Sequence, residues 1–251
     1  MAGEELTGKV AIVTGAGRNI GRAIALALAD AGAAVLVNAR SNRAEADSVA
    51  AEIAAIGGQA LVHIGNVADA KAVRAMADAA LAQFGRIDIL VNNAALRREK
   101  PFAEMDYGEW REILDITLDG AFHCTKACLA ALRASGAGTI INIGGLSAHT
   151  GAAHRAHVVT AKAGIVGLTR ALAHDLAADG ITVNCVVPGL IGTPRPTGQV
   201  EPAHHLRHDT MTGERGKPGD VAAVVRFLCT PAARYLTGQS IHVNGGAYLG
   251  G

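Results

Sequence analysis

The sequence predicts an α/β protein in which a doubly wound, seven-stranded, mostly parallel sheet forms a single domain. Short β-branched runs alternate with longer alanine-rich runs along all 251 residues. The runs that read as strands are apolar throughout, which is typical of a sheet covered by helices on both faces. No linker, charge block or internal repeat divides the chain. We therefore expect one domain over residues 1–251.

The expected strands and helices follow one another in alternation. Strands are expected at Val10–Thr14, Ala34–Asn38, Leu61–Ile64, Ile87–Val91, Thr139–Ile143, Thr182–Val187 and Ser240–Val243. Helices are expected at Gly21–Ala31, Ala44–Ile56, Ala70–Phe84, about Glu104–Ala134, Ala161–Ala178 and Val221–Leu228. Residues 192–219 are rich in Pro, His and Thr and show no period. We expect a mobile loop with short helices there, lying as a lid over a substrate site.

Composition excludes several classes of function. With 23 basic and 22 acidic residues the net charge is +1, so the chain shows no electrostatic signature of nucleic-acid or membrane binding. No apolar run approaches the ~18 residues of a spanning helix, and the polar N-terminus lacks a secretory signal. Four cysteines in a chain of this length do not form a disulfide framework. We expect a cytoplasmic protein.

A glycine-rich segment lies between the first expected strand and the first expected helix. Its sequence, Val13-Thr14-Gly15-Ala16-Gly17-Arg18-Asn19-Ile20-Gly21, combines a tight turn with a helix N-terminus. The free N–H groups and the dipole of such a terminus favour phosphate. The segment therefore predicts a nucleotide site.

With four further motifs, this segment resembles the short-chain dehydrogenase/reductase family, and the chain is similar to its 3-oxoacyl-ACP reductase branch. The motifs are Asn92-Asn93-Ala94-Ala95, Lys162, Pro188-Gly189 and Val243-Asn244-Gly245-Gly246. The resemblance implies a Rossmann fold, a nicotinamide cofactor and assembly as a homotetramer or homodimer. Asn19 and Ala95 stand where the family usually has Gly, but Asn tolerates a left-handed backbone better than most residues.

The resemblance also implies a set of cofactor-binding positions. These are Gly15, Arg18, Asn19, Ile20, Gly21, Arg40, Ser41, Asn66, Val67, Asn93, Ala94, Lys162, Pro188, Gly189, Ile191 and Thr193.

The end of the second strand favours NADP(H) over NAD(H). The segment Asn38-Ala39-Arg40-Ser41-Asn42-Arg43 has no carboxylate for the ribose hydroxyls of NAD. Arg40 and Arg18 are both suited to clamp a 2′-phosphate, although they also fit the description of solvated surface charges. Asn66 replaces the Asp that in the family usually bonds the adenine, and its amide oxygen is still an acceptor.

The family's catalytic tetrad is degenerate in this chain. The family delivers a proton from a Tyr four residues before the Lys, and here Val158 precedes Lys162 at that spacing. The family's Ser position falls on Gly145, with Ser147 as the alternative alignment, and its Asn position falls on Thr117. The only tyrosines, Tyr107, Tyr235 and Tyr248, lie far from Lys162 in sequence.

Histidines near the same segment are candidate substitutes for the missing acid. His154 or His157 would protonate an alkoxide, and His154 would share the Lys162 face if the helix has begun by that residue. Surface or interface roles are the favoured interpretation of both histidines, and Ser147 is a candidate carbonyl donor. We predict no metal site: His204 and His208 have an i, i+4 spacing but no obvious third ligand, and Cys124 and Cys128 fit packing better than zinc.

Two functions remain open from the sequence. In the first, the protein reduces a small-molecule carbonyl or oxidises an alcohol with NADP(H), using His154, His157 or a group of the substrate as a non-standard proton donor, with Lys162 and Ser147 as further candidate catalytic residues. In the second, it is a catalytically silent nucleotide-binding subunit of a homo- or hetero-oligomer. The sequence of the 192–219 loop gives no readable code for the substrate.

Overall fold

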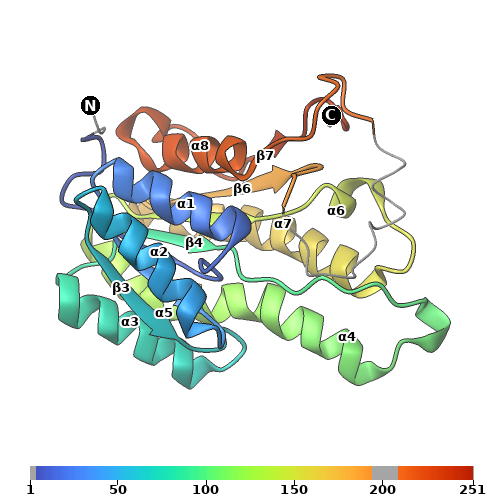
Figure 1. Cartoon of the computed structure of the whole chain (residues 1–251), viewed down its shortest axis with the longest axis horizontal. Coiled ribbons are helices and arrows are strands. Elements are labelled where there is room, and N and C mark those ends of the chain that lie inside the picture. Colours follow the sequence, from blue (N-terminus) through green and yellow to red (C-terminus); the bar gives the residue numbers. More distant parts are fainter. Residues whose placement is uncertain (1–3, 194–208, 251) are drawn as a thin grey trace.

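The computed structural model describes residues 4–193 and 209–250 and has three layers, a sheet between two layers of helices (Figure 1). The seven strands have the order β3-β2-β1-β4-β5-β6-β7, and each neighbouring pair is parallel. The chain therefore leaves β1 toward one edge of the sheet and returns at β4 toward the other. The carboxyl ends of β1 and β4 form the switch point, where open parallel sheets bind their ligands.

The strands lie close to their predicted positions, and the four at the centre are fully buried. Their bounds are β1 Val10–Val13, β2 Ala34–Ala39, β3 Ala60–Ile64, β4 Ile89–Asn92, β5 Thr139–Ile143, β6 Thr182–Pro188 and β7 Ser240–Val243. Alternate side chains point to opposite faces, so each face contributes to a separate aliphatic core.

The helices divide between the two faces. One face is covered by α1 (Asn19–Asp30), α2 (Arg43–Ala55) and α8 (Pro218–Cys229). The other is covered by α3 (Ala70–Phe84), α5 (Gly120–Ala134) and α7 (Ala156–Leu176), with α4 (Tyr107–Leu114) packed against α7. A short helix, α6 (Ser147–Thr150), follows β5 at the site end of the sheet. Within the described residues, no helix is both long and apolar enough to cross a membrane.

Three helix predictions were wrong in detail, and one of them is α8, which begins at Pro218 and not at Val221. The helix expected from about Glu104 starts at Tyr107, where Asp106 and Glu109 form a capping box, and it contains a π-helical turn, η2 (Asp115–Asp119). The helix expected from Ala161 begins five residues earlier, at Ala156. The β-branched run Val158-Val159-Thr160 lowers local helix propensity, but packing of this turn against α4 overrides it.

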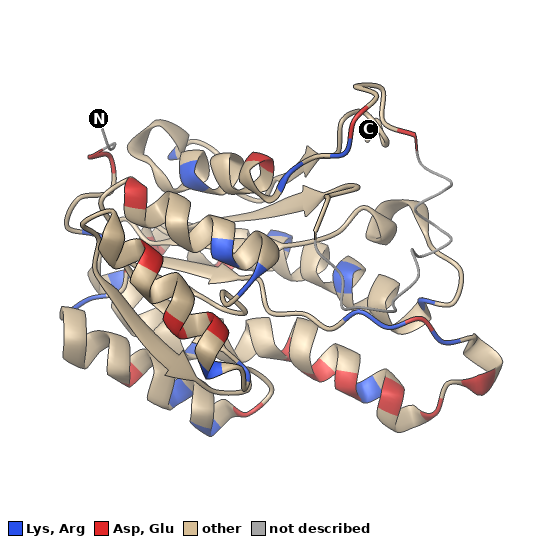
Figure 2. Cartoon of the chain, in the orientation of Figure 1, with Lys and Arg blue, Asp and Glu red and all other residues tan. Residues whose placement is uncertain are grey.

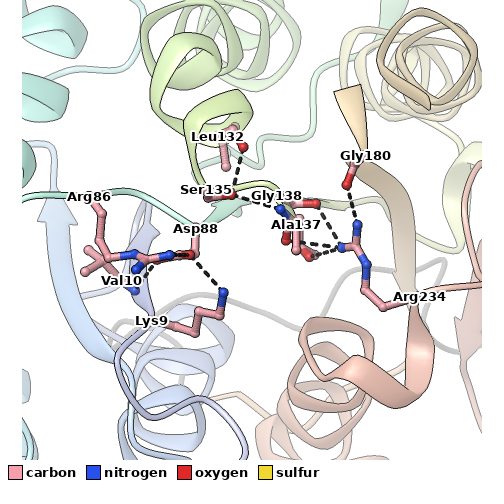
Figure 3. A network of polar contacts seen from close by, with 11 residues as sticks. Lys9, Val10, Arg86, Asp88, Leu132, Ser135, Ala137, Gly138, Gly180 and Arg234 are labelled. Carbon is pink, nitrogen blue, oxygen red and sulfur yellow. Dashed lines mark hydrogen bonds and ion pairs between the residues drawn. The ribbon is translucent and has the colours of Figure 1, made fainter. Parts of the chain in front are cut away.

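Two polar networks link the strands at the amino end of the sheet, opposite the candidate site (Figure 3). The buried carboxylate of Asp88 accepts hydrogen bonds from Lys9, Arg86 and the backbone N–H of Val10, at 3.1, 2.6 and 3.0 Å for the closest contacts. Arg234 donates to backbone carbonyls between α5 and β5 and to that of Gly180. These contacts fix the amino ends of strands whose carboxyl ends carry the candidate site.

Candidate cofactor and active site

The glycine-rich loop after β1 is held by the segment that follows β4. The Thr14 hydroxyl accepts hydrogen bonds from the backbone N–H groups of Asn93 and Ala94, each at 3.0 Å. In return, the Asn93 amide donates to the carbonyls of Thr14 and Gly15 at 2.8 and 3.0 Å. Asn93, predicted to bind the cofactor, therefore also fixes the shape of the loop.

The loop has the backbone that a phosphate cradle requires. A Cβ atom on Gly21 would lie 2.5 Å from the Asn93 amide nitrogen and would collide with the Gly15 carbonyl oxygen. Asn19 has a φ of +52°, the left-handed conformation that the family usually gives to glycine. No side chain caps the N-terminus of α1, and no acidic residue lies in its first turn. These features fit a cofactor with a pyrophosphate group.

Asn38, at the end of β2, is a residue that the sequence analysis left without a role. Its side-chain oxygen accepts from the Gly15 N–H at 3.3 Å, and its amide donates to the Gly65 carbonyl at 3.1 Å. The side chain is buried and links the loops after β1 and β3. The sequence signal for this role was an amide side chain directly after the apolar run Val35-Leu36-Val37.

The two arginines predicted to bind a 2′-phosphate lie in different surroundings. Arg18 is exposed just before α1. Arg40 is exposed but lies 3.8 Å from the Glu112 carboxylate of α4, which also pairs with Arg98. A carboxylate that the sequence analysis missed, Glu45 of α2, lies over the loop: its Oε2 would be 3.6 Å from a Cβ atom at Gly17. Ser41 is exposed beside Arg40.

The expected adenine side of the site is formed after β3. The side-chain oxygen of Asn66 accepts a hydrogen bond from the Ala68 N–H at 3.2 Å, which uses one of its two acceptor positions. Val67 is buried against Gly120 at the start of α5. The local turn thus orients Asn66 without blocking it.

Lys162 of α7 is buried beside the end of β5. Its ammonium donates to the carbonyl of Ile143 at 2.5 Å. Burial lowers the pKa of this lysine to about 7, and the positive charges of Arg97 and Arg155 add to the shift, while Cys185 opposes it. An amine that titrates near neutral pH is able both to bond a ribose hydroxyl and to exchange a proton.

The positions of the other tetrad members differ in what surrounds them. Val158 is buried in an apolar cluster formed by Ile113, Leu114 and Ala161, with Leu96 and Trp110 packed against it. Gly145 is open, since a Cβ atom there would meet only Cγ of Lys162, at 3.8 Å. Thr117 is buried in the π turn, and its hydroxyl has no hydrogen-bond partner among the described residues.

The candidate replacement acids are not equivalent. His154 precedes α7 in a left-handed conformation with a φ of +60°, so the condition that would place it on the Lys162 face of the helix is not met. It is exposed, and its carbonyl accepts from the Lys100 N–H at 2.7 Å. His157 is 1% exposed, and burial lowers its pKa, while a backbone hydrogen bond with Arg155 opposes the shift. Ser147 is half-buried as the first residue of α6.

Among the described residues, no tyrosine forms a hydrogen bond with Lys162, which donates to Ile143. Tyr107 and Tyr235 are exposed, and the Tyr248 ring packs against His149 and His242 with centroids 5.5 and 5.1 Å apart. No tyrosine contributes to the pKa shift of Lys162. Among the described residues, no group of three or more His, Cys, Asp or Glu side chains is arranged to hold a metal.

The segment after β6 closes the remaining side of the site. Pro188 accepts a hydrogen bond from the Leu146 N–H at 3.0 Å, and Gly189 packs closely on Asn244. Ile191 pairs with Gly216, so the two ends of the 192–219 loop lie together, with Thr193 just beyond. His204, His205 and His208 lie outside the described residues.

A doubly wound parallel sheet with a phosphate cradle at its switch point defines a dinucleotide-binding Rossmann protein. The family model described as enoyl-(acyl carrier protein) reductase matches residues 15–248. The 3-oxoacyl-[acyl-carrier-protein] reductase of Synechocystis sp. is 42% identical over 97% of this chain and 98% of its own length. The chain belongs to the short-chain dehydrogenase/reductase family.

Two solved structures show the same architecture with bound cofactors. A short chain dehydrogenase from Burkholderia cenocepacia J2315 in complex with NADP superposes with a TM-score of 0.90 at 34% identity, covering 97% of this chain and 99% of that one. A 7α-hydroxysteroid dehydrogenase complexed with NADH and 7-oxo glycochenodeoxycholic acid also has a TM-score of 0.90 at 34% identity, covering 96% and 95%. The fold therefore serves either nicotinamide cofactor.

Proposed function

We propose that this protein binds NADP(H) and catalyses reduction of a small-molecule carbonyl, or oxidation of an alcohol, with a proton donor other than tyrosine. The observation that carries this proposal is the pairing of an intact phosphate cradle with a buried, retained Lys162. When bound, the cofactor supplies the hydride. Gly15, Asn19 and Gly21 would hold its pyrophosphate, and Lys162 its nicotinamide ribose.

Lys162 is the donor that the geometry favours among the four candidates. A general acid works best when its pKa lies near the operating pH, and burial brings the pKa of Lys162 to about 7. His157 is enclosed between α7 and α4, and His154 lies outside the helix, so neither shares the open flank of Lys162 at Gly145.

NADP(H) is favoured over NAD(H) by Arg18 and Arg40, and the complex of the Burkholderia relative with NADP supports this choice. Arg40 would exchange its contact with Glu112 for the 2′-phosphate. Asn66 would accept the adenine amino group with its remaining acceptor position.

A second function is favoured by one observation. Val158 occupies the position at which the family has its proton donor, and here its side chain packs into an apolar cluster of the core. A protein that kept only the cofactor role of Lys162 would be a silent nucleotide-binding subunit of an oligomer.

One experiment separates the two functions. Trp110 is the single tryptophan, so energy transfer from it to NADPH reports binding. NADPH oxidation is then followed with a panel of ketones and β-ketoacyl thioesters. Turnover that is lost in Lys162→Met while NADPH binding is retained, and that is kept in His154→Ala and His157→Gln, supports the lysine donor, whereas a parent protein that binds NADPH without turnover supports the silent subunit. Loss in either histidine variant alone would move the donor role to that residue.

We further propose that the protein forms a homodimer or homotetramer through α5 and α7. Phe122 of α5 is half exposed, and a Cβ atom at Gly167 of α7 would meet nothing within 4 Å, so both helices have surfaces able to pack closely. Light scattering of the purified protein with and without Phe122→Glu tests this assembly, and a monomeric parent protein would contradict it.

A further inference from the structure

Four consecutive residues, Arg97-Arg98-Glu99-Lys100, run between β4 and α4 and form a mostly basic segment (Figure 2). The segment lies against the start of α7, because the Lys100 N–H donates to the His154 carbonyl at 2.7 Å. Leu96, the residue before Arg97, packs on the cluster that contains Val158 and Ala161 of α7. Arg97 therefore lies next to the turns of α7 that carry the tetrad positions.

The neighbours of Arg97 have acidic partners. Arg98 pairs with Glu112, and Lys100 lies 3.5 Å from Glu109, both on α4. Arg97 makes no ion pair with any residue in the ranges 4–193 and 209–250. The residue is exposed over part of its surface, while burial of its guanidinium lowers the pKa of Arg97.

Arg97 also adds to a concentration of positive charge around Lys162. Its charge lowers the pKa of both Lys162 and Arg155, which requires the three groups to lie near one another. Glu99 acts on Arg155 in the opposite direction. The field at this point favours an anion, and clusters of one sign of charge at a site raise the local concentration of a ligand of the opposite sign.

Space for a ligand group exists beside the lysine at Gly145. Gly145 leaves the flank of Lys162 open, because its nearest neighbour at the Cβ position is Cγ of Lys162 at 3.8 Å. A serine or larger residue would partly fill this space.

We infer that the substrate carries an oxyanion, a carboxylate or a phosphate, which the Arg97 guanidinium holds beside Lys162. The planar donors of a guanidinium match the two oxygens of such a group in a bidentate pair. This inference names the substrate class and rests on the proposed function, but the anion site itself is testable without turnover. An anion there would also favour the charged form of Lys162.

The test measures binding and needs no turnover. Protein saturated with NADP⁺ is titrated calorimetrically with acetoacetate, its neutral methyl ester, dihydroxyacetone phosphate and inorganic phosphate. Arg97→Gln is compared with Arg98→Gln, a matched control whose arginine is already paired with Glu112. We expect Arg97→Gln to weaken binding of the favoured anion about ten-fold or more, and Arg98→Gln to change it less than about two-fold.

Separate outcomes identify the anion and overturn the inference. Preference for acetoacetate assigns a carboxylate, and preference for dihydroxyacetone phosphate assigns a phosphate. Equal affinity for acetoacetate and its methyl ester, or an unchanged affinity in Arg97→Gln, would overturn the inference. A weaker NADPH affinity in Arg97→Gln would instead assign this arginine to the cofactor. Anion binding without NADPH oxidation would support the anion site and contradict only the proposed reaction.

Discussion

The flank of Lys162 faces Gly145, where a Cβ atom would lie 3.8 Å from Cγ of the lysine. The serine of the family thus fits at residue 145 without displacing its neighbours. Residue 158 is different, because Val158 is enclosed by Leu96, Trp110 and Ile113. The surroundings of residue 145 are therefore open, whereas those of residue 158 are apolar core.

Restoring both residues should create ordinary ketone reduction. We expect Gly145→Ser with Val158→Tyr to raise NADPH-dependent ketone reduction at least about 10²-fold, since a general acid typically contributes that much. The larger phenol should lower the free energy of unfolding by about 1–3 kcal/mol through overpacking, and Gly145→Ser alone should leave it unchanged. Steady-state rates and urea unfolding measure the two effects.

The control for this restoration is Lys162→Met in the double variant, which should abolish the gained activity. A double variant that folds, binds NADPH and still reduces no ketone would show that the tetrad positions have been assigned to the wrong residues.

Lys162 should make the stability of the cofactor-free protein rise with pH above neutrality. Burial lowers its pKa from 10.5 to about 7, so between these values the unfolded chain binds more protons than the folded one. The folded state therefore gains up to about 1.4 kcal/mol per pH unit from this group as the pH rises. Urea midpoints between about pH 7 and pH 8.5 measure the slope, and Lys162→Met should flatten it.

The upper limit of this window is set by the buried thiols. Burial raises the pKa of Cys185 to about 11, so in stronger base the unfolded chain loses protons that the folded protein keeps, and stability falls.

The exposed Lys126 of α5 provides the control for the Lys162 prediction, because Lys126→Met should leave the slope of stability against pH unchanged. An equal slope in Lys162→Met and in the parent would contradict the lowered pKa.

The sequence was sufficient for the sheet and for the backbone conformation of the glycine-rich loop. Apolar runs bounded by glycines fixed the strands to within two residues, and the tolerance of asparagine for a left-handed backbone correctly accounted for Asn19. What it missed depends on packing between distant segments. The start of α7 at Ala156 depends on contacts with α4, and the approach of Glu45 to the phosphate loop depends on how α2 lies over it. Residues 194–208 contribute nothing to this comparison, because they lie outside the described ranges.

Charges near the loop should set the preference between NADPH and NADH. Arg40→Gln removes a candidate phosphate partner and should weaken NADPH binding about ten-fold while leaving NADH binding unchanged. Glu45→Gln should have the opposite sign, because the Glu45 carboxylate lies over Gly17 and repels a phosphate brought to the loop. Energy transfer from Trp110 measures the affinities of Arg40→Gln and Glu45→Gln for NADPH and for NADH. Arg43→Gln is the matched control, since Arg43 is exposed and lies 3.8 Å from Asp47. Equal losses for NADH and NADPH in Arg40→Gln would reject the phosphate role.

Asp88 should stabilise the folded protein against acid. It lies at the amino end of the sheet, opposite the candidate site (Figure 3). Burial alone would raise the pKa of its carboxyl group, but hydrogen bonds from Arg86, the Val10 N–H and Lys9 hold the pKa below its usual value of 3.8. The stabilisation is therefore complete above that value and is lost as the pH falls through the lowered pKa. Asp88→Asn should reduce the free energy of unfolding at neutral pH by about 1–3 kcal/mol, less than a fully buried pair would lose because Arg86 and Lys9 are partly exposed.

Asp179→Asn is the control for that variant, because Asp179 pairs with Arg133 on the surface and its loss should cost less than about 0.5 kcal/mol. Urea unfolding at neutral pH and near pH 3 distinguishes the two carboxylates. In Asp88→Asn the difference between these conditions should be smaller than in the parent, since the group that loses its charge in acid has been removed. A parent and an Asp88→Asn variant that lose equal stability on acidification would show that the pKa of Asp88 is the same in the folded and unfolded chains, and that Lys9 and Arg86 do not hold it below its usual value.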